Sequence, residues 1–213
     1  MREATRTYAT APAVCGDLAQ PGVTRISAAL DWSREATTPD QRCIEAVLET
    51  RLVPGTALLH VGVGNAQLAQ RFVHRVRRID GLTMHPQEHI YATALGLPHY
   101  RVSVGNKYSP TVGTGLTPPY AWIIDNNLAS FACCRAHFWI MCATYLCALA
   151  PHGQIVTCQI GMDAYQADYG WAMTYAELVN LEHRLPVRVS KLTEVVYALA
   201  LRPCHAPDSG TLS

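Results

Sequence analysis

Two glycines, Gly62 and Gly64, stand at the end of a short apolar run and directly before a helical pattern. Glycine lets a backbone pass close to a ligand, and the N-terminus of a helix offers unpaired N–H groups. A strand, a glycine turn and a helix in this order are typical of the first unit of a nucleotide-binding α/β domain. The turn therefore predicts a nucleotide cofactor, and the other residues must indicate which one.

The run Asp125-Asn126-Asn127 is the second candidate for chemistry, because it ends a strongly apolar stretch that includes Trp122. Three polar side chains at the end of a buried strand are costly unless something pairs with them. One interpretation is that Asp125 or Asn126 holds an amino group of the cofactor or orients a nucleophile, which makes Asn126 and Asn127 catalytic candidates. The other is that an asparagine caps the following helix. Both interpretations stay open.

Other polar and aromatic side chains fall near the ends of expected strands. Residues 106–108 (Asn-Lys-Tyr) either contact adenine or a carboxylate or form a solvated turn. Tyr169 and Tyr175 are candidates for the reacting end, because aromatic faces attract a cationic group; ordinary packing is the alternative. His60 ends a core strand, where a hydrogen-bonded core histidine is favoured over a catalytic one.

Hydrophobic periodicity gives the elements that must position these residues. Strands are expected at 57–61, 77–84, 100–104, 120–125, 154–160, 187–192 and 194–201, with a loop at 161–170. Helices are expected within 24–52, where Pro39-Asp40 is a start signal, after the glycine turn, at 85–96, at 128–150, and from Thr174, where Glu177 completes a capping box. Strands that alternate with helices imply a parallel sheet, here with an antiparallel pair at the end. The site of such a sheet lies beyond the carboxyl ends of its strands, so the glycine turn and the 125–127 run should share one cleft.

The bulk composition narrows the function classes. Lys+Arg number 17 against 16 Asp+Glu, so no basic surface favours nucleic acid, and a small-molecule substrate is expected. The apolar stretch 128–150 carries Arg135 and His137 and is interpreted as a helix beside the sheet, not a membrane span. Eight cysteines without a C-x-x-C pair indicate free thiols in the cytoplasm and no metal site. The high apolar content is compatible with a homodimer.

Three parts are expected along the chain. Residues 1–52 should form an N-terminal arm and helices that cover the site, residues 53–203 the cofactor-binding domain, and residues 204–213 a tail. The dipeptide Pro54-Gly55 separates the first two parts.

A nicotinamide dinucleotide fits the glycine turn poorly. Its motif, G-x-G-x-x-G, would need a glycine where the chain has Gln67, and its second strand should end in an acid where the chain has Thr83. The terminal hairpin is also foreign to that fold.

The order of elements over residues 40–202 instead resembles the class I S-adenosylmethionine-dependent methyltransferases. The resemblance implies a Rossmann-like, seven-stranded, mostly parallel sheet with an antiparallel terminal hairpin and helices on both faces.

Two segments carry the resemblance. Residues 60–65 (His-Val-Gly-Val-Gly-Asn) resemble the first motif of that family, whose glycine turn touches the methionine part of the cofactor. Residues 81–88 resemble the second-strand segment of the cyclopropane-fatty-acid-synthase branch, G-[LI]-T-[LI]-S-x-x-Q, which implies that Thr83 and Glu88 bind the ribose. Three departures are Ala66 for the third glycine, Glu88 for glutamine, and Asn106 for the aspartate near adenine.

Together these arguments predict S-adenosylmethionine as cofactor or substrate. The candidate cofactor-binding residues are His60, Gly62, Gly64, Asn65, Thr83, Met84, Glu88, Asn106, Lys107, Tyr108 and Asp125.

The reaction itself stays open between classes. The first is methyl transfer to a small acceptor of natural-product type, which depends mainly on positioning. The second resembles the azetidine-2-carboxylate synthases, in which the cofactor's own α-amine attacks its γ-carbon and releases methylthioadenosine. A non-catalytic binding module is the third. The absence of an inserted acceptor domain and the mostly Asn and Tyr side chains of the site keep the second class open.

Overall fold

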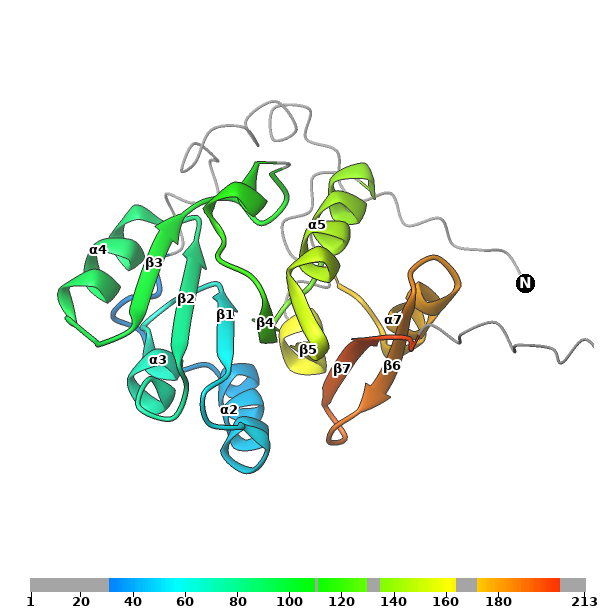
Figure 1. The fold of residues 1–213 in the computed structure, drawn as a ribbon, viewed down its shortest axis with the longest axis horizontal. Helices are drawn as coiled ribbons and strands as arrows, with labels where there is room; N and C mark the ends of the chain where they lie inside the picture. Colours follow the sequence, from blue (N-terminus) through cyan, green and yellow to red (C-terminus); the bar gives the residue numbers. More distant parts are fainter. Residues whose placement is uncertain (1–30, 110, 130–134, 164–171, 204–213) are drawn as a thin grey trace, which may run out of the picture.

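A computed structural model describes residues 31–109, 111–129, 135–163 and 172–203 of the chain. Its centre is a seven-stranded sheet with the order β3-β2-β1-β4-β5-β7-β6 (Figure 1). The strands are β1 (Ala57–Val61), β2 (Arg78–Thr83), β3 (Tyr100–Val104), β4 (Tyr120–Asp125), β5 (Leu149–Cys158), β6 (Val187–Lys191) and β7 (Val196–Leu201). The first five strands run parallel, and β7 pairs antiparallel with both β5 and β6. The predicted mostly parallel sheet with a terminal hairpin is confirmed.

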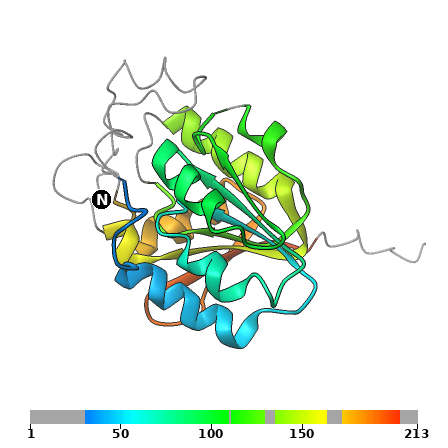
Figure 2. The same cartoon turned by 90° about the vertical axis from the view of Figure 1, so that its left-hand side faces the viewer.

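Helices cover both faces of the sheet, as predicted. They are α2 (Pro39–Arg51), α3 (Gln67–Phe72), α4 (Pro86–Ala94), α5 (Arg135–Ala148), α6 (Gln159–Asp163) and α7 (Tyr175–Asn180), with 3-10 turns η1 (Val112–Gly115) and η2 (Leu181–His183). Figure 2 shows α2, in blue, on one side of the sheet and α5, in yellow-green, on the other.

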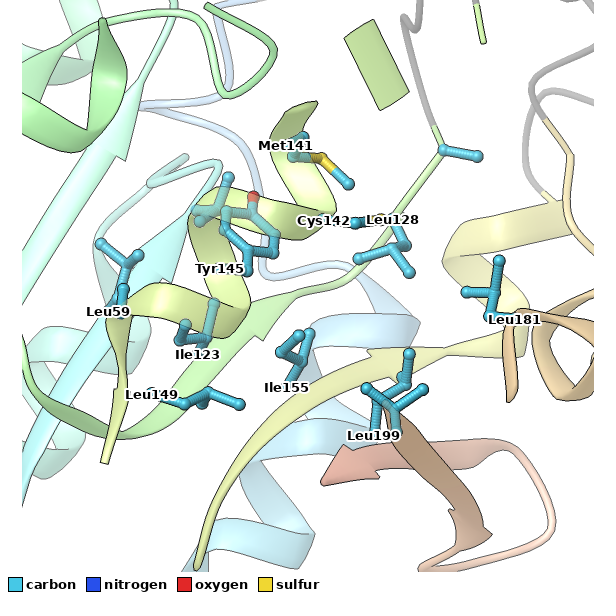
Figure 3. Packing of buried hydrophobic residues seen from close by; sticks show 14 of the residues in the cluster. Leu59, Ile123, Leu128, Met141, Cys142, Tyr145, Leu149, Ile155, Leu181 and Leu199 are labelled. Carbon is cyan, nitrogen blue, oxygen red and sulfur yellow. The ribbon is translucent and has the colours of Figure 1, made fainter. Parts of the chain in front are cut away.

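Alternation along the strands supplies a separate core to each face. Leu58 belongs to the cluster that packs under α2 and α3, whereas its neighbour Leu59 belongs to the cluster under α5 and α7. Both side chains are fully buried. Figure 3 shows Leu59, Ile123 and Ile155, from three neighbouring strands, lying against Tyr145 of α5. The central strands are therefore apolar on both sides, which is why β1 and β4 read as continuous hydrophobic runs.

The main differences from the sequence-based expectation lie at the two ends of β5. α5 ends at Ala148 and β5 begins at Leu149, although Pro151 and Gly153 resemble breakers. A register shift between β4 and β5, next to Tyr120, accommodates them. The expected loop after β5 begins with α6, where Gln159 Nε2 donates to Asp163 Oδ1 at 2.7 Å and to the Met173 carbonyl at 3.2 Å. Such a short helix depends on these tertiary contacts and leaves little periodic signal.

Other local signals are confirmed. α2 begins at Pro39, as predicted. The capping box before α7 is present, with Glu177 N–H donating to Thr174 Oγ1 and Thr174 N–H donating to Glu177 Oε2. Across the described ranges, no helix combines the length and the apolar character that a bilayer crossing requires. The helix expected around residues 24–32 lies largely outside the described residues, as does Tyr169.

Candidate functional site

A cavity of about 310 Å³ opens at the carboxyl edge of the central strands. Its wall is built from the segment before α2, the first turn of α2, the glycine turn, the ends of β2 and β4, the start of α4, the loop after β3, and α6. The predicted site residues on this wall are His60, Gly62, Gly64, Asn65, Thr83, Met84, Glu88, Lys107, Asp125, Asn126 and Asn127. The glycine turn and the 125–127 run therefore share one cleft, as expected for a parallel sheet.

The glycine turn owes its shape to backbone conformation. Gly62 and Gly64 have φ values of 78° and 52°, in the left-handed region that glycine adopts without strain. Ala66, at the place of the family's third glycine, also has a positive φ of 56°, so this alanine keeps the glycine-like turn. Asn65 ties the turn to the segment before α2, because its Nδ2 donates to the Glu35 carbonyl and to Thr37 Oγ1, each at 3.0 Å. The Asn65 amide therefore braces the wall of the cavity.

Glu88 joins three parts of the wall through one buried carboxylate. Oε2 accepts from the Gly64 N–H at 3.2 Å and from the Thr83 hydroxyl, and Oε1 accepts from the Trp32 N–H at 3.2 Å. All three neighbours are donors, so a carboxylate suits this position better than an amide, which would turn its NH₂ toward a donor. Two carboxylate oxygens offer about four acceptor sites in general, so capacity for a ligand hydroxyl remains.

Lys107 and Asp125 form a buried ion pair at the ends of β3 and β4. Lys107 Nζ donates to both Asp125 oxygens, at 3.0 and 2.9 Å, and to the Asn127 carbonyl at 2.7 Å. Tyr145 of α5 donates its hydroxyl to Asp125 Oδ2 at 2.9 Å. Burial lowers the pKa of Lys107 against the opposing pull of Asp125, and burial beside the same carboxylate raises the pKa of Tyr145 well above its usual value. Although Asp125 lies on the cavity wall, its acceptors are engaged by the protein.

His60 is buried at the centre of the sheet and lines the cavity. It is 1% exposed, and neither ring nitrogen has a hydrogen-bond partner among the described residues. Burial lowers the pKa of His60 from 6.5 to about 4, so the ring is neutral near pH 7. The prediction of a hydrogen-bonded core histidine is therefore wrong for the described residues, none of which bonds to the ring.

Three predicted residues lie away from this cavity, which corrects the expectation that they share it. Asn106 lines a separate hollow of about 220 Å³, and its Oδ1 accepts from the Tyr108 N–H at 3.0 Å. Tyr108 is fully buried and donates to the Leu128 carbonyl at 3.2 Å. Tyr175 packs against Tyr197 with ring centroids 4.7 Å apart. The turn after β3 points its asparagine and tyrosine inward, and α7 lies against the terminal hairpin.

The sequence-based prediction missed several wall residues. These are Trp32, Thr37, Thr38, Asp40 and Gln41, ahead of and within α2. The start signal at Pro39-Asp40 was recognised, but a start signal locates a helix in the chain and not its neighbours in space. The described residues contain no group of three His, Cys, Asp or Glu arranged to hold a metal ion.

Comparison of the structure with solved structures gives many similar folds. The N-methyltransferase NodS from Bradyrhizobium japonicum WM9, in complex with S-adenosyl-L-homocysteine, matches with a TM-score of 0.60 at 10% identity, over 89% of this chain and 97% of that chain. A TehB-like SAM-dependent methyltransferase from Corynebacterium glutamicum ATCC 13032 Kitasato matches with a TM-score of 0.55 at 13% identity, over 74% and 85%. This chain has the class I S-adenosylmethionine-dependent methyltransferase fold.

The same fold also appears in a protein whose described activity is not methyl transfer. The [4+2]-cyclase SpnF matches with a TM-score of 0.53 at 19% identity, over 70% of this chain and 57% of that chain. No family model and no curated protein matches the sequence. The class I fold therefore places the site at the carboxyl edge of the sheet without naming the reaction.

Proposed function

We propose that the chain binds S-adenosylmethionine in this cavity and catalyses displacement at a carbon attached to the sulfonium. The observation that carries the proposal is the Glu88 carboxylate, which meets the glycine turn and Thr83 at the cavity wall and keeps acceptor capacity for a ribose hydroxyl. Two similar structures are complexes with such ligands: NodS with S-adenosyl-L-homocysteine, and the DhpI-SAM-HEP complex with SAM.

The charges on the wall fit a cationic ligand. Asp40, Glu88 and Asp125 supply carboxylates, and the one lysine or arginine among the described wall residues, Lys107, is paired with Asp125. The net negative wall complements a sulfonium and an ammonium group. When bound, S-adenosylmethionine supplies an electrophilic carbon next to a positively charged sulfur. In the proposal, Glu88 and Thr83 hold the ribose, and the glycine turn lets the ligand lie close to the backbone. Asn126 and Asn127 orient the attacking group.

The remaining features of the proposal rest on composition. A net charge of +1 favours a small-molecule acceptor over nucleic acid. Natural-product metabolism, a cytoplasmic location and a homodimer stay predictions.

A second candidate reaction, cyclisation, is favoured by the size of the cavity. About 310 Å³ is at the lower end of the range for small-molecule pockets and leaves little room for an acceptor beside a nucleoside with an amino-acid chain. In cyclisation the α-amine, after losing a proton, attacks the γ-carbon of the same molecule. The C–S bond breaks, its electron pair stays on sulfur, and the products are azetidine-2-carboxylate and methylthioadenosine.

Incubation of the purified protein with S-adenosylmethionine alone, followed by mass spectrometry, separates these reactions. Methylthioadenosine together with an azetidine amino acid establishes cyclisation. No turnover until an acceptor is added, followed by S-adenosylhomocysteine, establishes methyl transfer. Calorimetric binding without turnover under either condition indicates a binding module, and absence of binding to both S-adenosylmethionine and S-adenosylhomocysteine refutes the proposal.

Asn126 tests the proposed catalytic group. We expect Asn126→Ala to lower turnover by about tenfold or more, because a lost positioning hydrogen bond of about 1.4 kcal/mol corresponds to that factor. Thermal unfolding must show a folded variant. Unchanged turnover in a folded Asn126→Ala protein would remove Asn126 from the mechanism.

A further inference from the structure

One end of the cavity holds three acceptor groups that have no partner among the described residues. The Asp40 carboxylate on the first turn of α2 lines the cavity and has no hydrogen bond or ion pair within the described part of the chain. His60 is buried with both ring nitrogens unbonded, and the Oδ1 atom of Asn126 is buried without a partner. Each unsatisfied buried polar group is unfavourable in general, so a ligand that bonds to all three would relieve them together.

Gly161 lies between the Asp40 carboxylate and the backbone of Asn126. A Cβ atom at Gly161 would lie 2.7 Å from Asp40 Oδ2 and 2.5 Å from the Asn126 carbonyl oxygen. The start of α2, the end of β4 and α6 therefore meet at a point where only glycine fits. His60 ends β1, the strand that pairs directly with β4, and its partner there is Ile124, two residues before Asn126. The three acceptors thus border one corner of the cavity from adjoining elements.

The other carboxylates on the wall are already engaged. Asp125 accepts from Lys107 and Tyr145. Glu88 accepts from three donors at the opposite side of the glycine turn, where α4 begins. Lys107, the nearest cation on the wall, donates its amine to Asp125 and to backbone carbonyls. Of the three carboxylates on the described wall, Asp40 is therefore the one whose oxygens accept from no described group.

We propose that Asp40, His60 and Asn126 Oδ1 form the subsite for the α-amino group of the sulfonium ligand. An ammonium group carries three N–H donors, and the corner offers three acceptors: a carboxylate, a neutral ring nitrogen and an amide oxygen. The assignment rests on the proposed function, because it takes S-adenosylmethionine or its product as the ligand. The sequence pattern suggested Asp125 or Asn126 for the amine contact. The assignment keeps Asn126 and replaces Asp125 with Asp40, which that pattern did not single out.

Two ligands that differ only in the amino group test the subsite. S-Adenosylhomocysteine has it, and 5′-deoxy-5′-(3-carboxypropylthio)adenosine keeps the carboxylate and lacks the amine. Calorimetry on the full chain gives the affinity ratio of the two ligands for the wild type, for Asp40→Asn and for His60→Leu. Glu49→Gln, on the same helix but paired with Arg71 and Arg75, and His74→Leu, on an exposed side chain, are the matched controls.

The wild type and both controls should bind S-adenosylhomocysteine at least about tenfold more tightly than the desamino analogue, as expected for charge-assisted hydrogen bonds. In Asp40→Asn and His60→Leu this ratio should fall about tenfold while the affinity for the analogue stays near the wild-type value. A ratio within threefold of wild type in either folded variant overturns the role of that residue. An equal loss for both ligands also overturns it, because the residue would then contact another part of the ligand.

Failure of the proposed function gives a different result. If neither ligand binds the wild-type chain, the cavity does not accept this class of nucleoside, and the subsite assignment is overturned with it. If the wild type binds both ligands equally, the cavity accepts the nucleoside but the amino group has no subsite. Asp40→Asn alone decides the point if His60→Leu does not fold, since Asp40 is only partly buried.

Discussion

Asp40 and Asp125 are two aspartates on the wall of one cavity, and they differ in how many hydrogen bonds they form within the described protein. Asp125 is 3% exposed and accepts from Lys107 and Tyr145, so folding itself uses its charge. Asp40 is partly buried and bonds to no described side chain. Asp125 therefore connects the end of β4 with α5, whereas the acceptors of Asp40 are not used by the described part of the protein.

The difference shows that residue type and position in a cleft do not identify a binding group. An apolar strand that ends in a carboxylate suggests a ligand contact, but a buried partner of opposite charge meets the same need. What distinguishes a ligand contact is unused hydrogen-bonding capacity. Four predictions test this contrast, from the largest expected effect to the smallest.

Lys107→Met should lower the free energy of unfolding by about 3–5 kcal/mol, because it leaves the Asp125 carboxylate buried without its counter-charge. Urea denaturation of the wild type and the variant measures the change. Lys191→Met is the control, since the Lys191–Glu194 pair is exposed and separated by 3.8 Å, and it should cost less than about 0.5 kcal/mol. A loss below about 1 kcal/mol in Lys107→Met would show that the buried pair is not structural.

Glu88→Gln should weaken binding of S-adenosylhomocysteine by about ten- to a hundredfold, because hydrogen bonds to a charged group are worth about 1.5–3 kcal/mol. Glu88 is intermediate between Asp40 and Asp125 in its use of hydrogen bonds. Protein donors occupy part of its hydrogen-bonding capacity, and the rest is left for a ribose hydroxyl. Calorimetry measures the affinity, with Glu194→Gln at an exposed carboxylate as control. Wild-type affinity in a folded Glu88→Gln protein would place the ribose elsewhere.

His60→Asn should flatten the acid dependence of stability. The folded pKa of His60 is about 4 and the ordinary value is 6.5, so between these values the unfolded chain binds more protons and stability falls as pH falls. From pH 7 to pH 5 this group accounts for a loss of about 2 kcal/mol. Denaturation at both pH values should show that loss in the wild type and in His74→Asn, but a smaller loss in His60→Asn. Equal losses in all three proteins contradict a neutral, buried His60.

Asp40→Asn should change the free energy of unfolding by less than about 0.5 kcal/mol, because no described side chain bonds to its carboxylate and the substitution keeps its size. The measurement is the same denaturation experiment that is used for Lys107→Met. A loss of 2 kcal/mol or more would mean that the fold uses Asp40 as it uses Asp125.

Much of the fold could be predicted because its signals are local. β1, β3 and β4 have the predicted bounds, since each is a short apolar or alternating run between clear breakers. The glycine turn and the α7 capping box are equally local. α6 could not be predicted, because Gln159 bonds to the Met173 carbonyl just before α7. The start of β5 could not be predicted either, because the conformation around Pro151 depends on pairing with β4.

The candidate site divides in the same way. Glu88 was predicted from a motif within a single strand-to-helix segment. Asp40 was missed because its neighbours, Asn126 and Gly161, lie far along the chain and no spacing rule connects them. Asn106, Tyr108 and Tyr175 were placed at the cleft because they follow or approach strand ends. Asn106 instead lines a separate hollow, Tyr108 is buried in the core, and Tyr175 packs against Tyr197.

The sequence by itself determined the order of strands and helices and the edge of the sheet at which the cavity opens, because hydrophobic period and glycine turns act over a few residues. Only the tertiary structure decided which polar groups at that edge remain open. Packing of the sheet and helices brings together side chains that are far apart in the sequence. Lys107 therefore pairs with Asp125, and among the described residues Asp40, His60 and Asn126 Oδ1 have no partner. Unused hydrogen-bonding capacity is a property of that packing, and no residue carries it alone.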